Sequence, residues 1–487
     1  MTSSLNYGAI VRVIGRLVLI EALLLLFPLA VCLVYGESEW KSFAVAALSA
    51  GAAGGIAEAC TLRRPATVRS REGFVITSVI WIVFALFGVI PFMLGHNPLS
   101  FTDAVFEVIS GLTTTGASMI SDVEALPHGL LFWRALTQWI GGLGIVLFML
   151  AVLPELNKAT GISMFQAEAT GITHDKIHPR IRQTAISVWG VYCVLTIVTI
   201  LLLWAGPMSL FDSTCQTFAA VATGGFTTRN AGVEYWHSDY VLVVLAVSMF
   251  LAGLNFSMMY NVWRNGIMTA LRNSIFRVFS IVTLCAFLLL MFSLAVSGED
   301  AGEGGGAVKA FFHVVSAITS TGFTIGAAEG WGPFALFLTV MLMLCGSCTG
   351  STSGGIKIDR LMALNTNLGN EIKRTVFPKR TYVVHLNGTA LNTAQMSRIT
   401  AFVFIYLVVV IVSTGIIAMY GYAFEDSLFM TASCIGCNGL GYGATGAGGG
   451  YALLPDGVKW LLTADMLVGR LELFTFLVLF LPSFWRR

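Results

Sequence analysis

One sequence pattern occurs four times along this chain of 487 residues. It consists of an apolar segment, a shorter helix-like segment, a Thr/Gly-rich turn and a second long apolar segment. Three turns are near copies and the fourth is degenerate; they read Thr113-Thr114-Thr115-Gly116-Ala117-Ser118, Ala222-Thr223-Gly224-Gly225-Phe226-Thr227, Thr319-Ser320-Thr321-Gly322-Phe323-Thr324 and Gly436-Cys437-Asn438-Gly439-Leu440-Gly441. Because internal repeats fix the architecture of a fold, we expect four equivalent units around one axis. Turns that enter a membrane and meet on an axis can form a ring of backbone carbonyl groups.

The composition indicates a protein surrounded by lipid. Hydrophobic residues make up 56% of the chain and charged residues 11%, and the mean hydropathy is +0.81, whereas a soluble domain carries about 25% charged residues. The net charge of +2 gives no indication of a nucleic-acid partner. The nine cysteines form no disulfide framework of the kind found in small secreted folds.

A helix that crosses a bilayer needs about 20 mostly apolar residues. We predict ten spans, of which the eighth is interrupted by a Gly/Ser-rich stretch: 14–35, 40–60, 74–95, 132–154, 184–205, 240–262, 277–297, 333–366, 399–421 and 457–482. Four segments between spans are too short to cross and are predicted to enter and return as pore helices: 102–113, 211–222, 308–320 and 425–435.

The predicted fold class is therefore an all-α polytopic membrane protein. It has four pseudo-symmetric helix–pore helix–filter–helix repeats around one pore, preceded by an N-terminal two-helix hairpin. The predicted boundaries are 1–72 for the hairpin and 73–156, 157–275, 276–375 and 376–487 for the repeats, the third of which contains the interrupted span.

The basic residues indicate the orientation, because cytoplasmic segments are enriched in lysine and arginine. With the N-terminus inside, all but six of the 28 lysines and arginines lie on the cytoplasmic side. The exceptions are Arg470, within the last span, and five residues on the outer side: Lys41, Arg134, Arg229, Lys309 and Lys459. Both termini are then cytoplasmic, and all four turns open toward the outside.

The turns have the chemistry of a site for a monovalent cation. Glycine allows a backbone with positive φ, which lets carbonyl groups point inward, and each short helix directs its partly negative C-terminal end at the axis. Sites for Ca²⁺ or Mg²⁺ use carboxylates, and none of the four turns contains one. A single Thr-Thr-Gly sequence is more often a tight turn or helix end, but four copies in one frame favour a shared site.

The chain resembles the Trk/Ktr/HKT superfamily of potassium transporters, and most of all the Trk-type bacterial potassium-uptake membrane subunit. Besides the turns, the resemblance rests on three motifs: QWIGGLGI at 138–145, GSCTGSTSGGIKI at 346–358 and VGRLE at 468–472. It covers nearly the whole chain and implies potassium uptake across the bacterial inner membrane, through a carbonyl-lined selectivity filter and driven by the membrane potential or an ion gradient. The first two spans match the additional hairpin of the Trk branch.

The resemblance also implies the filter residues, whose bound K⁺ is the only metal expected in this chain. They are Thr114, Thr115, Gly116, Thr223, Gly224, Gly225, Thr321, Gly322, Phe323, Cys437, Asn438 and Gly439. The fourth turn departs from the Trk pattern, which usually reads Gly-Pro-Gly-Leu-Gly, because Cys437 and Asn438 precede Gly439. This departure leaves the ratio of K⁺ to Na⁺ selectivity open, although Gly116 favours K⁺, since HKT members that carry Na⁺ often have serine there.

The interruption of the eighth span contains four glycines in the ten residues 346–355. Such a segment cannot sustain a good helix, and a break that faced lipid would leave backbone groups without hydrogen bonds. We therefore expect it to face the pore just inside the filter, where the resemblance implies a movable gate; the alternative is a static kink packed by small residues. The predicted gate residues are Gly346, Gly350, Ser351, Thr352, Gly354, Gly355, Lys357 and Arg470.

Arg470 places a charge within the last span, and such a charge is a functional hypothesis by default. The resemblance implies that it lies in the pore below the filter. The alternative is an ion pair between helices with Asp465 or Glu472, although neither residue is three or four positions away.

Two Cys-x-x-Cys pairs, Cys345/Cys348 and Cys434/Cys437, would suggest zinc in a soluble protein. Here one pair flanks the interrupted span and the other the fourth turn, so small packing residues are the favoured interpretation. No pattern places catalytic groups convincingly, and we expect neither an enzyme nor a cofactor in this chain.

The predicted partners are K⁺, as the transported ion, and the lipid bilayer, with no nucleic acid. The longest cytoplasmic segments, about 157–183 and 367–397, are basic and too short for a nucleotide-binding domain. The resemblance implies a homodimer that works with a peripheral cytosolic nucleotide-binding regulatory subunit. Two alternative functions stay open: a Na⁺-permeable or Na⁺-coupled K⁺ transporter of the Ktr/HKT type and, more remotely, a polytopic membrane enzyme.

Overall fold

The computed structural model describes residues 5–62, 68–95, 97–144, 181–297, 306–326, 330–446, 450–471 and 473–485. Within these ranges the regular structure is helical except for one short antiparallel hairpin, β1 (His385–Leu386) with β2 (Thr389–Ala390). The all-α fold class is confirmed.

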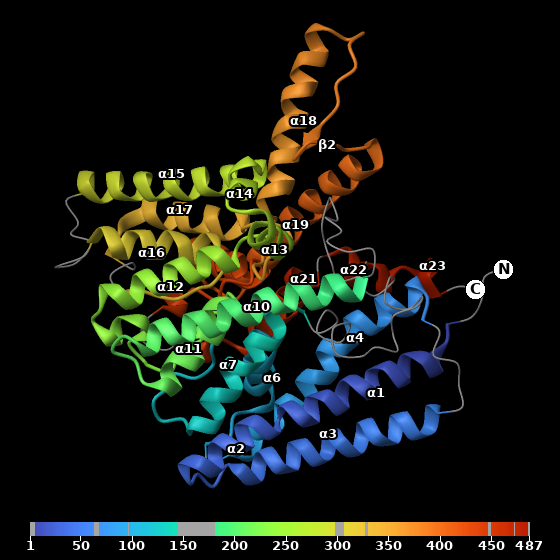
Figure 1. The fold of residues 1–487 in the computed structure, drawn as a ribbon, viewed down its shortest axis with the longest axis vertical. Coiled ribbons are helices and arrows are strands. Elements are labelled where there is room, and N and C mark those ends of the chain that lie inside the picture. Colours follow the sequence, from blue (N-terminus) through green and yellow to red (C-terminus); the bar gives the residue numbers. More distant parts are fainter. Residues whose placement is uncertain are drawn as a thin grey trace.

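The N-terminal hairpin consists of α1 (Tyr7–Leu24), which continues after a kink as α2 (Leu26–Tyr35), and α3 (Trp40–Thr61). Small residues let α1 and α3 approach closely, since a Cβ on Gly54 would lie 2.7 Å from the carbonyl oxygen of Gly15. Arg16 also forms an ion pair with Glu58 of α3 at 3.0 Å. The hairpin is thus a packed unit, seen along the lower edge of Figure 1.

Four groups of helices follow. The first contains α4 (Ser70–Gly88), α5 (Ile90–Leu94), α6 (Phe101–Leu112) and α7 (His128–Gly142). The second contains α10 (Ile181–Trp204), α11 (Leu210–Val221), η2 (Gly232–Trp236), α12 (Asp239–Ala252), α13 (Phe256–Asn265) and α14 (Met268–Arg272). The third contains α15 (Ser274–Ser297), α16 (Gly306–Ile318), α17 (Gly332–Cys345) and α18 (Ile358–Val376). The fourth contains α19 (Thr393–Met419), α20 (Phe424–Ile435), η4 (Gly443–Thr445), η5 (Gly450–Leu453), α21 (Asp456–Arg470), α22 (Phe474–Leu477), η6 (Val478–Phe480) and α23 (Pro482–Trp485).

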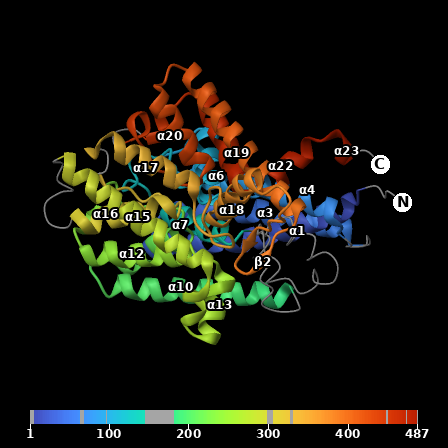
Figure 2. The same cartoon turned by 90° about the horizontal axis from the view of Figure 1, so that it is seen from above.

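These groups surround a common centre. In Figure 2 the colours follow one another around it, from the blue and teal helices through green and yellow to the orange and red helices. The short helices α6, α11, α16 and α20 are each buried over most of their length, and the last nine residues of α6 are all buried. The four predicted pore helices therefore exist, each within one or two residues of the predicted bounds.

Six helical segments of the described part are long and apolar enough to cross a membrane. They are Tyr7–Tyr35, Trp40–Thr61, Arg71–Leu94, Gln183–Trp204, Ser274–Ser297 and Thr393–Met419, and they correspond to six of the ten predicted spans. A seventh is obtained if α12 and α13 count as one span, although they meet at a bend of 98°.

The predictions of unbroken helices over 240–262 and 457–482 were wrong, because α12 ends at Ala252 and α21 ends at Arg470. The third group differs as well, since α18 begins only at Ile358 and projects away from the body of the molecule (Figure 1) instead of completing a span. Such breaks are tolerated because the surrounding protein satisfies the freed backbone groups; the carbonyl of Gly253, for example, accepts the N–H of Cys348 at 3.1 Å. The predicted span 132–154 is described only as far as residue 144.

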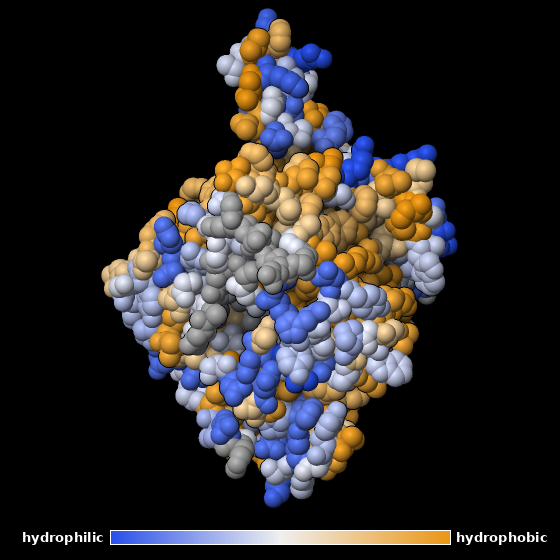
Figure 3. Space-filling view, turned by 90° about the vertical axis from the view of Figure 1, so that its left-hand side faces the viewer, coloured by the Kyte–Doolittle hydropathy of each residue, from blue (hydrophilic) through white to orange (hydrophobic). Residues whose placement is uncertain are grey.

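The exposed surface of the long helices is apolar, as lipid contact requires. Phe404 and Ile411 of α19, for instance, are 67% and 69% exposed. On the side of the molecule that lies on the left in Figure 1, hydrophobic residues gather across the upper part of the main body and on its right, below a projecting segment of mixed character (Figure 3).

Candidate functional site

The four short helices end in the same backbone motif. In each, an N–H bonds back five residues to a carbonyl of the helix, as Thr115 does to Ser110 at 2.8 Å and Asn438 does to Ser433 at 2.8 Å. The residue before that donor is left-handed in all four turns: Thr114 (φ 55°), Thr223 (φ 55°), Ser320 (φ 54°) and Cys437 (φ 50°). Glycine is usual at this position of a helix C-terminus, so threonine, serine and cysteine here do not predict this conformation.

The next left-handed residue of each turn is glycine, as predicted. The φ angles are 82° at Gly116, 76° at Gly225, 76° at Gly322 and 74° at Gly439. A Cβ at any of the four would overlap a backbone carbonyl of another repeat. Glycine is therefore required here both for its conformation and for the space that its missing side chain leaves.

These overlaps show that the turns close into a ring. Gly116 faces the carbonyl of Gly224, Gly225 faces that of Thr321, and Gly322 faces that of Asn438. Gly439 completes the circle by facing the carbonyl of Thr115. We call the backbone of these four turns the carbonyl ring. The C-terminal ends of four helices converge on it, which makes its centre favourable for a cation.

Different side chains support the ring from behind. The hydroxyls of Thr113 and Thr115 are 2.8 Å apart in the first turn, and those of Thr319 and Thr321 are 2.8 Å apart in the third. In the fourth turn Asn438 donates through Nδ2 to the carbonyl of Ala317 at 2.9 Å. Phe323 is buried next to the third glycine, and its carbonyl accepts the hydroxyl of Ser316 at 3.0 Å.

A buried ion pair between α6 and α7 of the first repeat lies beside the ring. Nε of Arg134 lies 2.7 Å from Glu107, and their side chains are 3% and 0% exposed. Arg134 also donates to the carbonyl of Thr227 at 3.2 Å and to the hydroxyl of Ser118 at 3.0 Å. Sequence reasoning counted Arg134 only as an outer basic residue, because the pairing of α6 with α7 cannot be seen in a linear sequence.

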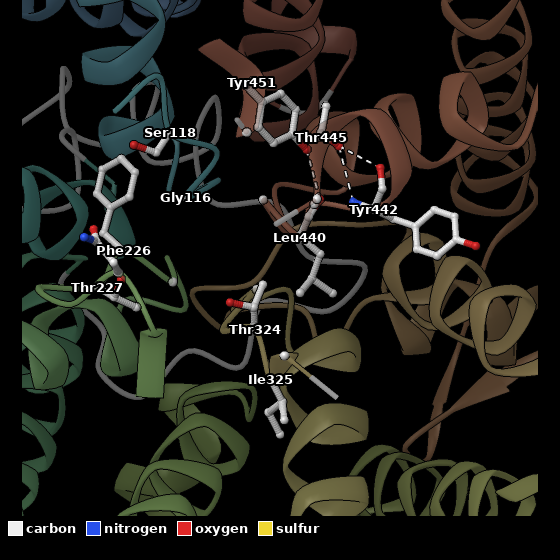
Figure 4. Close-up of a pocket in the computed structure, with 18 of the residues that line it drawn as sticks. Gly116, Ser118, Phe226, Thr227, Thr324, Ile325, Leu440, Tyr442, Thr445 and Tyr451 are labelled. Atoms are coloured by element: carbon white, nitrogen blue, oxygen red, sulfur yellow. Dashed lines mark hydrogen bonds between the residues drawn. The ribbon is translucent and has the colours of Figure 1, made fainter. Parts of the chain in front are cut away.

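A cavity of about 510 Å³ opens on one side of the ring. The four ring glycines form part of its lining, together with side chains such as Ser118, Phe226, Thr324, Tyr442 and Tyr451. Figure 4 shows these residues arranged around the space, with the hydroxyl of Tyr451 bonded to the carbonyl of Leu440 at 2.9 Å. The ring thus lies at the base of a vestibule to which all four repeats contribute.

The loop of residues 346–357, here called the central loop, lies against the other side of the ring. The hydroxyl of Thr352 is 3.1 Å from that of Thr223, and the N–H of Gly354 donates to the hydroxyl of Ser320 at 3.1 Å. A Cβ on Gly354 would overlap the carbonyl of Gly436 in the fourth repeat. The loop therefore contacts the turns of three repeats.

The remaining predicted residues of the central loop shape its path. Gly346, Gly350 and Gly355 have φ angles of 67°, 77° and 80°, and Ser351 donates to the carbonyl of Cys348 at 2.6 Å. Lys357, with φ 81°, is 6% exposed and donates from Nζ to the carbonyl and the hydroxyl of Ser353. Lys357 is therefore turned back into the loop rather than lying at a membrane boundary.

Arg470 links the central loop to the first repeat. Its guanidinium donates to the carbonyl of Thr352 at 2.5 Å and to the carbonyls of Gly141 and Gly142 at 2.6 Å each. Asp465, one candidate for an ion pair, instead accepts the hydroxyl of Ser413 at 2.9 Å; the other, Glu472, lies outside the described residues. The arginine thus lies beneath the ring, next to the loop.

The two Cys-x-x-Cys pairs contain free thiols. Cys437 is itself the left-handed residue of the fourth turn, and Cys348 is buried in the central loop. Among the described residues, no group of three or more His, Cys, Asp or Glu side chains is placed to hold a metal ion. The carbonyl ring, on which four helix C-terminal ends converge, is the candidate cation site.

Comparisons with known proteins agree with this arrangement. Residues 43–487 match the family model of TrkH, described as a cation transport protein. The chain is 34% identical to the Trk system potassium uptake protein TrkH of Salmonella typhimurium, over 99% of this chain and 100% of that protein. It is 31% identical to TrkG of Escherichia coli, over 97% of each chain. The crystal structure of the potassium transporter TrkH from Vibrio parahaemolyticus superposes with a TM-score of 0.88 at 28% identity, covering 99% of this chain and 100% of that one.

Proposed function

The chain belongs to the TrkH family of cation transport proteins, and we propose that it takes up potassium through the carbonyl ring, which acts as the selectivity filter. The observation that carries the proposal is the closure of four turns into one ring, each glycine facing a carbonyl of another repeat. Relatives named as potassium uptake proteins align over their full length, which supports the same cargo. The proposed filter residues are those predicted from the sequence, together with Ser320, which takes the place of Thr114 in the third repeat.

The chemistry of the ring supports a monovalent cation. Backbone carbonyls are neutral oxygen ligands that can replace the hydration shell of K⁺. Helix C-terminal ends add partial negative charge without the carboxylates that divalent cations prefer. A cation that moves inward through the ring is driven by about 2.3 kcal/mol per 100 mV of membrane potential.

We propose the central loop as the gate. It lies directly beneath the ring and touches the turns of three repeats through hydroxyl and backbone hydrogen bonds. Arg470 holds the carbonyl of Thr352 and would present a positive charge to an ion leaving the filter. Opening of the proposed gate would require these bonds to break together.

The membrane topology follows from the same assignment. We propose that the vestibule faces the outside of a bacterial inner membrane and that both termini are cytoplasmic, since this orientation places most lysines and arginines inside. We also propose that the chain is divided as predicted, into an N-terminal hairpin followed by four repeats. Within it, each described repeat contributes one short helix and one turn to the ring.

Family membership further supports two partners: a second copy of this chain, and a peripheral cytosolic nucleotide-binding subunit of the Trk type. Of the two basic segments predicted to face the cytoplasm, 157–183 lies largely outside the described residues. In the other, the second half of α18 is largely exposed, and Lys373 and Arg374 lie in its last turn. Co-purification of the chain with such a subunit from the same genome tests this part of the proposal.

Growth of a potassium-uptake-deficient bacterium tests the function. Expression of the chain should restore growth at low K⁺, and added Na⁺ should not abolish the rescue. Growth that depends on Na⁺ would favour a Na⁺-coupled transporter instead. No rescue by a protein shown to reach the membrane would contradict the proposal.

Removing the charge of Arg470 tests the gate. Arg470→Ala loses three hydrogen bonds to carbonyls and the positive charge below the ring, so we expect ⁸⁶Rb⁺ flux into proteoliposomes to rise roughly tenfold. Arg470→Lys keeps the charge and should raise flux less. Unchanged flux in a well-folded Arg470→Ala protein would contradict the proposed role of Arg470 in the gate.

A further inference from the structure

The carbonyl of Gly224 has a partner that sets it apart within the ring. Nε2 of Gln138 donates to this carbonyl at 2.6 Å, and Oε1 of the same side chain accepts the N–H of Phe226 at 3.2 Å. The two bonds bracket Gly225, the second glycine of the ring. Gln138 is 0% exposed and belongs to α7 of the first repeat, so it reaches across a repeat boundary.

Gln138 also explains why the second turn reads Gly-Gly. The residue before the ring glycine is Thr115 in the first turn, Thr321 in the third and Asn438 in the fourth. A Cβ on Gly224 would lie only 2.5 Å from Cδ of Gln138. The glutamine therefore occupies the space that a threonine or asparagine side chain fills in the other turns. In the described part of the chain, the carbonyls of those three residues accept no side-chain hydrogen bond.

In the fourth repeat the equivalent helix, α21, packs without a glutamine at this place. Gly141 approaches the last carbonyl of α6, at Leu112, and Gly469 approaches the last carbonyl of α20, at Ile435. Three residues before these glycines lie Gln138 and Met466, which are both buried. Methionine fills the equivalent place in the fourth repeat, so the amide of Gln138 serves the neighbouring turn rather than the helix packing.

We propose that Gln138 is a specificity-determining residue of the carbonyl ring. This inference rests on the proposed function of the ring as a filter. The donor fixes the direction of the Gly224 carbonyl, and it also draws on the electron density that this oxygen offers to an ion. To contract around Na⁺, which is smaller than K⁺, the ring would have to pull this oxygen away from Nε2, so the bond disfavours Na⁺.

Gln138→Met tests the proposal, because methionine has a similar length and lacks both hydrogen bonds. We expect the ratio of K⁺ to Na⁺ flux in proteoliposomes to fall about tenfold. This is the effect of losing the one buried hydrogen bond that holds the Gly224 carbonyl. Gln216→Met is the matched control: Gln216 is also 0% exposed, and its Nε2 lies 3.5 Å from the hydroxyl of Thr228 rather than on a ring carbonyl. The control should keep the wild-type ratio.

Gln138→Glu gives a second test within a folded protein. A protonated glutamate can keep both bonds, whereas an ionised one keeps only the bond from Phe226. The K⁺/Na⁺ ratio of this variant should therefore be close to wild type at acid pH and should fall at alkaline pH, while the ratio of the wild type stays constant. This readout is independent of a general loss of stability.

Two outcomes would overturn the inference: a wild-type ratio in Gln138→Met, or an equal fall in Gln216→Met together with a pH-independent ratio in Gln138→Glu. Stabilisation of the wild-type protein by K⁺ and its K⁺ flux test the proposed function separately from the role of Gln138. If the wild-type protein is not stabilised against heat by K⁺ and carries no flux of it, the filter assignment itself is wrong, and the inference is overturned with it.

Discussion

The second and fourth turns have the same backbone conformation, but the side chains that support them come from different places. Their left-handed residues match closely, with φ angles of 55° and 76° at Thr223 and Gly225 and of 50° and 74° at Cys437 and Gly439. The second turn is held by Gln138, which reaches in from the first repeat. The fourth turn instead extends its own Asn438 to the carbonyl of Ala317 in the third repeat.

This difference teaches that the backbone is the shared element of the ring and that its supports are interchangeable. The fourth turn looks degenerate in sequence because its support has moved into the turn itself. The carbonyl of Asn438 nevertheless faces Gly322 in the same way as the carbonyl of Gly224 faces Gly116.

The largest expected effect tests the shared backbone. Gly225→Ala and Gly439→Ala each force a Cβ into a carbonyl of another repeat, at a positive φ that alanine disfavours. We expect ⁸⁶Rb⁺ uptake to fall at least about 1,000-fold in both, which corresponds to about 4 kcal/mol. Gly369→Ala is the control, since a Cβ there meets nothing within 4 Å. A mild effect at Gly439 alone would break the comparison and make the fourth turn a bystander.

The next effect concerns the buried ion pair between α6 and α7 of the first repeat. Arg134→Met leaves Glu107 buried without its ion-pair partner, so we expect a loss of about 3 kcal/mol in the free energy of unfolding. Thermal unfolding in detergent measures it. The double variant Arg134→Met with Glu107→Leu should recover part of the loss, because no unpaired charge remains; no recovery would show that Arg134 acts through another contact.

A smaller effect is expected at the seam between the third and fourth repeats. Asn438→Ala removes one neutral hydrogen bond, to the carbonyl of Ala317, and should cost about 1 kcal/mol in unfolding free energy. Asn438→Thr supplies the residue found in the first and third turns and should transport K⁺ with wild-type selectivity. A loss of selectivity with threonine would mean that the supports are not interchangeable.

The smallest effect is expected for Tyr451→Phe. The carbonyl of Leu440 loses the tyrosine hydroxyl at 2.9 Å but keeps the hydroxyl of Ser433 at 2.8 Å. We expect a change of about 0.5 kcal/mol or less in unfolding free energy and an unchanged K⁺/Na⁺ ratio. A large change in that ratio would identify the vestibule wall, rather than the ring, as the selective element.

The sequence predicted the fold class, the four short helices and the ring glycines because each of these features repeats locally. It did not predict the left-handed Thr114 and its three counterparts, because threonine, serine and cysteine carry no signal for that conformation. It also missed the roles of Gln138 and Arg134, whose partners are distant in sequence. The breaks after Ala252 and Arg470 escaped notice because apolar composition continues across them, and the supporting bonds come from other repeats.

The central claim is that one cation binds where the four turns meet. The most direct test is anomalous diffraction from crystals of the protein grown in Rb⁺. The account predicts Rb⁺ density within the ring, between the carbonyls of Thr115, Gly224, Thr321 and Asn438, and its loss when Na⁺ replaces Rb⁺. Rb⁺ density only elsewhere in the protein, or an equally occupied ring in Na⁺ alone, would contradict it.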